Sequence, residues 1–178
     1  MDSSKEQKTM SNKGFYTIPF VWNRKLWVMT FAFFVLWIGV SGYMLYEVCT
    51  TEQNIEEIIS LIIFNVVMLP TMLLCEGYAP QRLEVGESQI VILRRYNSVT
   101  ILRSIIIAIE PLSAKDKRWT ANLGGCGGLF GYFGRFSNRR LGEFTMYATA
   151  MDNLYLITTA DGKKWVINCS EPDLLQKK

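Results

Sequence analysis

The stretch LWVMTFAFFVLWIGVSGYMLY, residues 26–46, decides the architecture of the chain, because it contains no charged residue. A helix rises about 1.5 Å per residue, so this stretch is long enough to cross a hydrocarbon core about 30 Å thick. A cleaved signal peptide is the alternative, but the apolar run is too long and no small-residue cleavage pattern follows it. We therefore predict a transmembrane helix over residues 26–46.

A second uncharged stretch, IISLIIFNVVMLPTMLLC, follows at residues 58–75 and contains Asn65 and Pro70. A buried core helix would normally present one polar face, and this stretch has none. The sequence therefore predicts a second membrane helix over residues 58–75. Together with an external loop at residues 47–57, it forms a transmembrane hairpin over residues 26–75.

The charges around the two stretches predict how the hairpin is oriented. The flank before the first helix carries five basic residues, and the region after the second helix is also rich in Lys and Arg. The connector EVCTTEQNIEE, by contrast, has four glutamates and no basic residue. The positive-inside rule then places residues 1–25 and 76–178 in the cytoplasm. The net charge of +3 is accordingly interpreted as a topology signal, with no nucleic-acid partner.

Trp37 and Asn65 lie at similar depths of the predicted hairpin, counted from the helix midpoints. Polar side chains in lipid tend to find hydrogen-bond partners, which predicts a contact between the Trp37 indole N–H and the Asn65 amide. In the alternative, Trp37 faces lipid and Asn65 bonds to another subunit.

From Glu76 onward the hydrophobic pattern changes to a two-residue period, which is typical of strands with one buried face. The Asp161-Gly162 pair predicts a hairpin turn between the last two strands. No helix long enough for a parallel crossover intervenes, so we expect antiparallel succession. SEPDLLQKK, residues 170–178, opens like a helix, with Ser170 as its cap. Seven strands are predicted, near residues 81–85, 89–96, 99–110, 117–123, 142–149, 153–159 and 163–169.

This order of elements, together with GGLFGYFGRF, YAT and DGKKWVI, resembles the bacterial pleckstrin-homology-like (PH) domain family over roughly residues 81–178. The resemblance implies an all-β or α+β domain: two nearly orthogonal sheets that form a seven-stranded, partly open barrel, closed by a C-terminal helix. The closing helix is short here, so packing of Leu174 and Leu175 must hold it. The wider class binds phosphoinositides with basic residues at the first hairpin, whereas this hairpin carries Glu84 and Glu87, so that recognition is not inherited.

The segment GGCGGLFGYFGRF, residues 124–136, is rich in glycine and aromatic residues. A phosphate-binding loop is disfavoured, because no Lys follows the last glycine and no helix begins there. A structural interpretation explains more: glycines permit positive φ angles, and the rings are buried where a loop folds over a barrel rim. In a third interpretation the segment is an interaction loop that contacts another subunit or anionic lipid. Its candidate residues are Leu129, Phe130, Tyr132, Phe133, Arg135, Phe136, Arg139 and Arg140.

The composition argues against catalysis and metal binding. The chain has no histidine, and its four cysteines are scattered without a C-x-x-C pair, which disfavours structural zinc. No carboxylate pair or nucleophile motif stands out in the predicted cytoplasmic part. We therefore expect a non-enzymatic protein without cofactors.

The sequence as a whole predicts a multi-pass protein of the bacterial cytoplasmic membrane that acts as a protein-interaction or scaffold module, with a protein partner or self-association. An anionic-lipid headgroup sensor and a small subunit of a transporter or immunity complex are the alternatives. The partner and the oligomeric state are not specified by the sequence.

Overall fold

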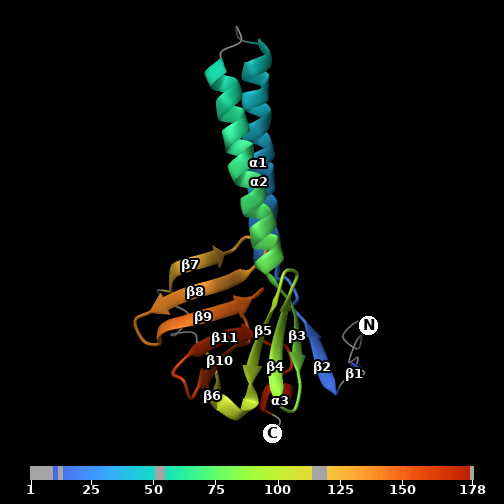
Figure 1. The fold of residues 1–178 in the computed structure, drawn as a ribbon, viewed down its shortest axis with the longest axis vertical. Coiled ribbons are helices and arrows are strands. Elements are labelled where there is room, and N and C mark those ends of the chain that lie inside the picture. The colour runs from blue at the N-terminus through green and yellow to red at the C-terminus, as the bar shows by residue number, and fades with distance from the viewer. Residues whose placement is uncertain (1–9, 12–13, 51–54, 114–119, 177–178) are drawn as a thin grey trace.

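The computed structural model describes residues 10–11, 14–50, 55–113 and 120–176. Two long helices lie side by side and project from one end of a β-rich domain (Figure 1). The helices are α1 (Arg24–Thr50) and α2 (Ile55–Tyr78), each longer than the predicted 26–46 and 58–75. The start of α1 is capped, since the Asn23 side-chain oxygen accepts a hydrogen bond from the Leu26 backbone N–H at 2.8 Å.

Both helices are apolar and long enough to cross a membrane, judged by length and composition. Only 6% of the most apolar window of each helix is buried within the chain. The core helix of a soluble domain would be mostly buried, and these two helices are not. Their exposed apolar surfaces indicate that lipid or another protein surrounds them.

Eleven strands form two separate sheets in the described part of the chain. The five-stranded sheet has the order β1 (Met10–Ser11), β2 (Phe15–Pro19), β3 (Pro80–Val85), β4 (Gln89–Arg94) and β5 (Ser98–Leu102). The six-stranded sheet has the order β6 (Ile106–Pro111), β10 (Leu154–Thr159), β11 (Lys164–Asn168), β9 (Gly142–Ala148), β8 (Tyr132–Asn138) and β7 (Ala121–Gly127). The short helix α3 (Pro172–Gln176) follows, as predicted.

The predicted count of seven strands is wrong, and the described strands form two packed sheets without a closed barrel. The predicted strand 99–110 is two strands, because the 3₁₀ turn η1 (Arg103–Ile105) carries the chain from one sheet to the other. The glycine-rich segment supplies β8, and the N-terminal region supplies β1 and β2. The predicted strand 117–123 corresponds to β7, and its residues 117–119 lie outside the described residues.

The prediction of purely antiparallel succession is also wrong. Strands β9 and β11 are parallel neighbours, with Met146 opposite Val166. The crossover that a parallel pair requires is β10 with its two turns, since β10 lies on the far side of β11 and pairs with β6. The predicted Asp-Gly turn does join β10 to β11, and Gly162 has a φ of 79°.

Strand β2 precedes α1 and pairs antiparallel with β3, which follows α2. The pair places Pro19 opposite Arg82, and the Phe20 N–H donates to the Gln81 carbonyl at 3.0 Å. Ile18 is 4% exposed and belongs to the core between the sheets. The helical hairpin is therefore an insertion between two neighbouring strands of one sheet.

The main core lies between the two sheets and is closed by α3. It includes Leu83, Ile90, Ile92 and Ile101 from one sheet and Phe133, Tyr147, Ile157 and Ile167 from the other. Leu174 and Leu175 are 9% and 0% exposed, which agrees with the expected packing of the closing helix. A second cluster covers the outer face of the six-stranded sheet: Phe136, Phe144, Met146, Ala148, Leu154, Leu156 and Val166.

We predict that Ile18→Ala lowers the stability of the domain by about 2–5 kcal/mol, because it leaves a cavity in the core. Thr17→Ala, on the neighbouring position of the same strand, is the control, and its expected cost is below about 1 kcal/mol. Thermal unfolding of the full-length protein in detergent measures both. Equal unfolding temperatures for the two variants would show that β2 is not part of the folded sheet.

Candidate functional site

The glycine-aromatic segment is a β-hairpin, β7–β8, in place of the predicted rim loop. Gly125 lies opposite Gly134 in this hairpin. A Cβ on Gly134 would be 2.4 Å from the Gly124 carbonyl oxygen, and its φ is 114°, a conformation that side chains rarely adopt. A Cβ on Gly125 would be 2.1 Å from the Phe133 carbonyl oxygen. The glycines thus serve a close approach of two backbones.

The tip of this hairpin packs against the beginning of α1. Phe130 has a φ of 59°, and its backbone N–H donates to the Thr30 hydroxyl at 3.3 Å. Its ring makes edge contacts with Trp22 at 6.0 Å and Phe34 at 6.1 Å between centroids. Gly128 at the tip leaves room for Met29, because a Cβ there would be 2.5 Å from the Met29 methyl. The tip is therefore an anchor between the domain and α1.

The residues of the predicted interaction loop separate into two groups. The aromatic and aliphatic members are covered: Phe133 and Phe136 are 7% and 5% exposed, and Leu129, Phe130 and Tyr132 are half-buried. The basic members Arg135, Arg139 and Arg140 are exposed. The rings are therefore covered, as the structural interpretation of residues 124–136 expects. A role of the basic residues in contacts remains a prediction.

The end of α2 is joined to the domain by the β4–β5 turn. Tyr96 donates from its backbone N–H to the Gly77 carbonyl at 3.2 Å and from its hydroxyl to the Leu73 carbonyl at 3.3 Å. The Gly77 carbonyl is one of the last four of α2, which have no partner within the helix, and the Leu73 carbonyl lies one turn earlier. Gly77 is required here, because a Cβ would lie 1.9 Å from the Tyr96 ring. Arg95 and Glu76 add an ion pair at 2.7 Å.

Asn65 does contact α1, but through a different residue than predicted. Its side-chain oxygen accepts a hydrogen bond from the Ser41 hydroxyl at 3.2 Å, and its amide donates to the Leu61 carbonyl at 3.0 Å. The Trp37 indole N–H is buried and has no hydrogen-bond partner among the described residues. Ser41 lies one helical turn beyond Trp37, so the estimate of depth was wrong by about one turn.

Two cavities lie at opposite ends of the domain. The junction pocket, of about 320 Å³, lies between the end of α2 and the sheets, and its lining includes Tyr78, Arg94 and Tyr147. The corner cavity, of about 480 Å³, lies where the chain passes from β5 to β6, beside α3. The sequence interpretation missed both, because each is lined by residues distant in sequence.

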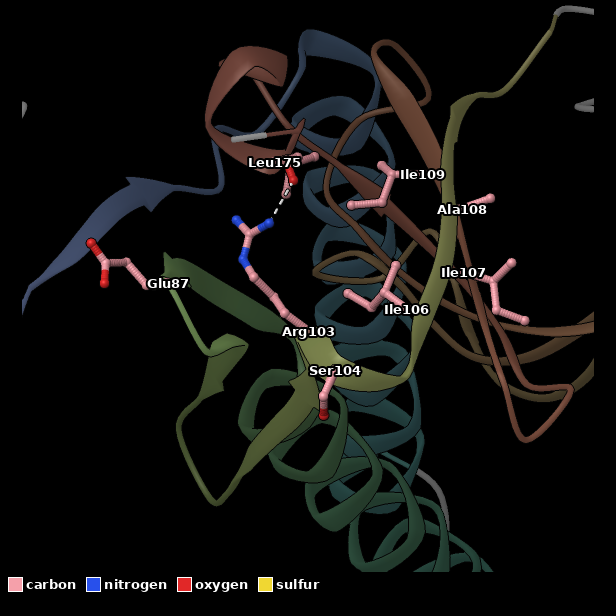
Figure 2. A pocket seen from close by; sticks show the side chains of 8 residues that line it. All are labelled: Glu87, Arg103, Ser104, Ile106, Ile107, Ala108, Ile109 and Leu175. Carbon is pink, nitrogen blue, oxygen red and sulfur yellow. Dashed lines mark hydrogen bonds between the residues drawn. The ribbon is translucent and has the colours of Figure 1, made fainter. Parts of the chain in front are cut away.

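Arg103 organises the corner cavity (Figure 2). Its guanidinium donates to the carbonyls of Leu174 and Leu175, both at 3.0 Å, and to the Gly86 carbonyl at 2.8 Å. Burial lowers the pKa of Arg103 from its ordinary value. Arg103 therefore caps the last carbonyls of α3 and ties that helix to the β3–β4 turn.

The thiols of Cys126 and Cys169 are poorly suited to nucleophilic chemistry. Burial, with a smaller contribution from the neighbouring Cys75, raises the pKa of Cys126 to about 12, and burial raises that of Cys169 to about 11. A reactive cysteine needs its thiolate form near neutral pH. Among the described residues, no group of three or more His, Cys, Asp or Glu side chains is placed to hold a metal ion.

Two packed sheets closed by a C-terminal helix, with cavities at their ends, define a β-domain of the pleckstrin-homology-like type. The bacterial PH domain family model matches residues 81–178. This region is more than half of the 178 residues, and the chain belongs to the bacterial PH domain family. Searches of curated proteins and of solved structures found no match to the chain. Membership of this family indicates a binding or scaffold module.

We predict that Gly134→Ala destabilises the domain by about 1–3 kcal/mol or more, because alanine must adopt an unfavourable φ against a neighbouring backbone. Gly124→Ala is the matched control on the facing strand, since a Cβ there meets nothing within 4 Å. Chemical denaturation of the full-length protein compares the two. If both variants unfold at the same denaturant concentration, the close pairing of β7 and β8 is not a determinant of stability.

Proposed function

We propose that this protein is a non-catalytic, membrane-anchored binding module of the bacterial cytoplasmic membrane. In this proposal α1 and α2 cross the membrane, the predicted loop at residues 47–57 is external, and both ends of the chain are cytoplasmic. The domain boundaries are those predicted above, with β2 of the N-terminal segment added to the cytoplasmic domain. The charge distribution and the exposed apolar surfaces of the two helices support this placement.

The attachment of the helices to the domain supports a fixed orientation. Each helix is held at its domain end by its own contact, Phe130 for α1 and Tyr96 for α2. The β2–β3 pairing closes the same junction from the sheet side. The helices leave the domain at one end (Figure 1). In this proposal that end faces the membrane and the opposite end faces the cytoplasm.

The observation that best supports protein binding is the apolar surface at that opposite end. Leu102, Ile105 and Ile107 are 48%, 36% and 69% exposed, within one short segment at the β5–β6 corner. In Figure 2, Ile106 and Ile109 point toward Arg103, whereas Ile107 points to the other side of the strand. Strand β6 is also an edge of its sheet, so its outer backbone groups can pair with a partner.

Confinement to the membrane explains how a small contact surface can bind its partner. A weak contact surface reaches a high effective concentration toward partners in the same membrane, and needs no large interface. We therefore propose that the corner surface (Leu102, Ile105 and Ile107) contacts a cytoplasmic part of another membrane-associated protein.

The topology is tested with reporters fused after Lys178. A fluorescent protein that matures only in the cytoplasm should be active at this position, and a phosphatase that requires the periplasm should be inactive. The expected result follows from an even number of membrane crossings with cytoplasmic basic flanks. Activity of the periplasmic reporter alone would contradict the proposed placement of the domain.

The corner surface is tested by photo-crosslinking in intact cells. A photoreactive residue at position 107 should form an adduct with a discrete protein, and Leu102→Lys should remove this adduct by placing a charge in the contact. Position 123 is the matched control, because Leu123 is 49% exposed on the opposite edge strand, β7, of the same sheet. Equal adducts at positions 107 and 123 would refute a specific contact at the corner.

A further inference from the structure

The junction pocket combines apolar walls with one cationic side chain. Leu74 and Cys75 of α2 form one side, and Cys126 and Phe133 of the six-stranded sheet form another. Arg94, at the end of β4, contributes the charge. The pocket lies at the end of the domain that carries the helices, remote from the β3–β4 turn, whose Glu87 lines the corner cavity.

Arg94 is held in place by aromatic rings. Its guanidinium carbon lies 5.5 Å from the centroid of the Tyr78 ring and 5.1 Å from that of the Tyr147 ring. Its Nη1 donates to the Tyr147 hydroxyl at 3.5 Å, a long and weak hydrogen bond. Cation–π contacts of this kind position the guanidinium but leave its charge uncompensated.

The charge of Arg94 has no counter-ion within the described part of the chain. Its Nε is buried and has no hydrogen-bond partner, and no carboxylate of the described residues lies within ion-pair distance. The adjacent Arg95 is the opposite case, because it is exposed and paired with Glu76 at 2.7 Å. An unsatisfied donor of a charged group in an apolar surrounding is costly, and a bound anion would remove that cost.

The position of the pocket indicates the kind of anion. Leu73 and Leu74 of α2 are 59% and 53% exposed beside it, on a helix proposed to be surrounded by lipid. Trp22 and Trp27 pack together at the start of α1, at the same end of the hairpin, where aromatic residues favour the headgroup layer. Basic pockets at this depth on the cytoplasmic side are typical sites for anionic headgroups.

We propose that the junction pocket binds one anionic phospholipid of the inner leaflet, with its phosphate on Arg94 and its acyl chains along α2. The proposal rests on the membrane placement in the proposed function and adds a ligand to it. The bound lipid would fill the space between α2 and the six-stranded sheet, and so set how the domain sits against the membrane.

The test uses the full-length protein in nanodiscs that contain equal amounts of phosphatidylglycerol and phosphatidylethanolamine. The protein is released into the gas phase, and native mass spectrometry counts the lipids that remain bound. The wild type should retain one phosphatidylglycerol in preference to phosphatidylethanolamine. Arg94→Gln should lower this preference about tenfold or more, as expected for loss of hydrogen bonds to a charged group.

Arg95→Gln is the matched control, because it removes the same charge at the next position, and it should retain the lipid. Arg94→Lys keeps a cation but loses the planar stacking group, and should retain an intermediate preference. If Arg94→Gln fails to fold, the preference of the wild type for phosphatidylglycerol over phosphatidylethanolamine still tests the proposal. A wild type that retains both lipids equally overturns the proposal, and so does an equal loss in Arg94→Gln and Arg95→Gln.

A further comparison distinguishes a lipid from a free anion. Glycerol phosphate and inorganic phosphate are added to the protein in phosphatidylethanolamine nanodiscs, and thermal unfolding is followed. Neither should match the stabilisation given by phosphatidylglycerol, because neither fills the apolar part of the pocket. Equal stabilisation by inorganic phosphate would overturn the lipid proposal in favour of a simple anion site.

Failure of the lipid proposal can be distinguished from failure of the proposed function. Leu102→Lys should abolish the crosslink formed from position 107 and leave lipid retention unchanged. If the chain inserts into nanodiscs but shows no anionic selectivity, only the lipid proposal fails. If the chain does not insert, the proposed membrane placement fails and the lipid proposal fails with it.

Discussion

The pairing of β2 with β3 is the constraint on which the rest of the structure depends. These strands lie on either side of the helical hairpin in the sequence, yet they are hydrogen-bonded neighbours. Closing a long loop costs conformational entropy, but two packed antiparallel helices already bring its ends together. The hairpin and the sheet therefore support each other. This arrangement explains why the family match at residues 81–178 begins within β3, while the folded domain also includes Ile18.

Glycines allow the close contacts at the junction between the helices and the domain and within the β7–β8 hairpin. Gly77, Gly128 and Gly134 each stand where a Cβ would meet a ring, a methyl or a backbone oxygen within 2.5 Å. Gly77 lets the Tyr96 ring approach α2 and Gly128 leaves room for Met29 of α1, whereas Gly134 allows the close pairing of β7 with β8. A glycine-rich segment of this kind needs no phosphate to explain it, although its composition alone is compatible with several roles.

The two arginines that line the cavities illustrate how the surroundings decide the role of a residue type. Arg103 has backbone carbonyls as partners on three of its nitrogens, so it is a structural cap for α3. Arg94 has two aromatic rings and one weak hydrogen bond, so its charge is available for a ligand. In the sequence Arg94 belongs to an Arg-Arg pair near the end of the predicted strand 89–96, and Arg103 lies within the predicted strand 99–110. No local pattern predicts their different roles.

The sequence by itself determined the elements that depend on local periodicity: two apolar helices, most of the strands after Glu76, the turn at Asp161-Gly162 and the short closing helix. It also indicated the family, through the order of these elements together with GGLFGYFGRF, YAT and DGKKWVI. Only the tertiary structure decided that β2 joins the sheet, that β9 and β11 are parallel, and that Asn65 bonds to Ser41. The physical reason is that hydrophobic period and turn chemistry act over a few residues, whereas strand partners and cavities depend on contacts between segments far apart in the chain.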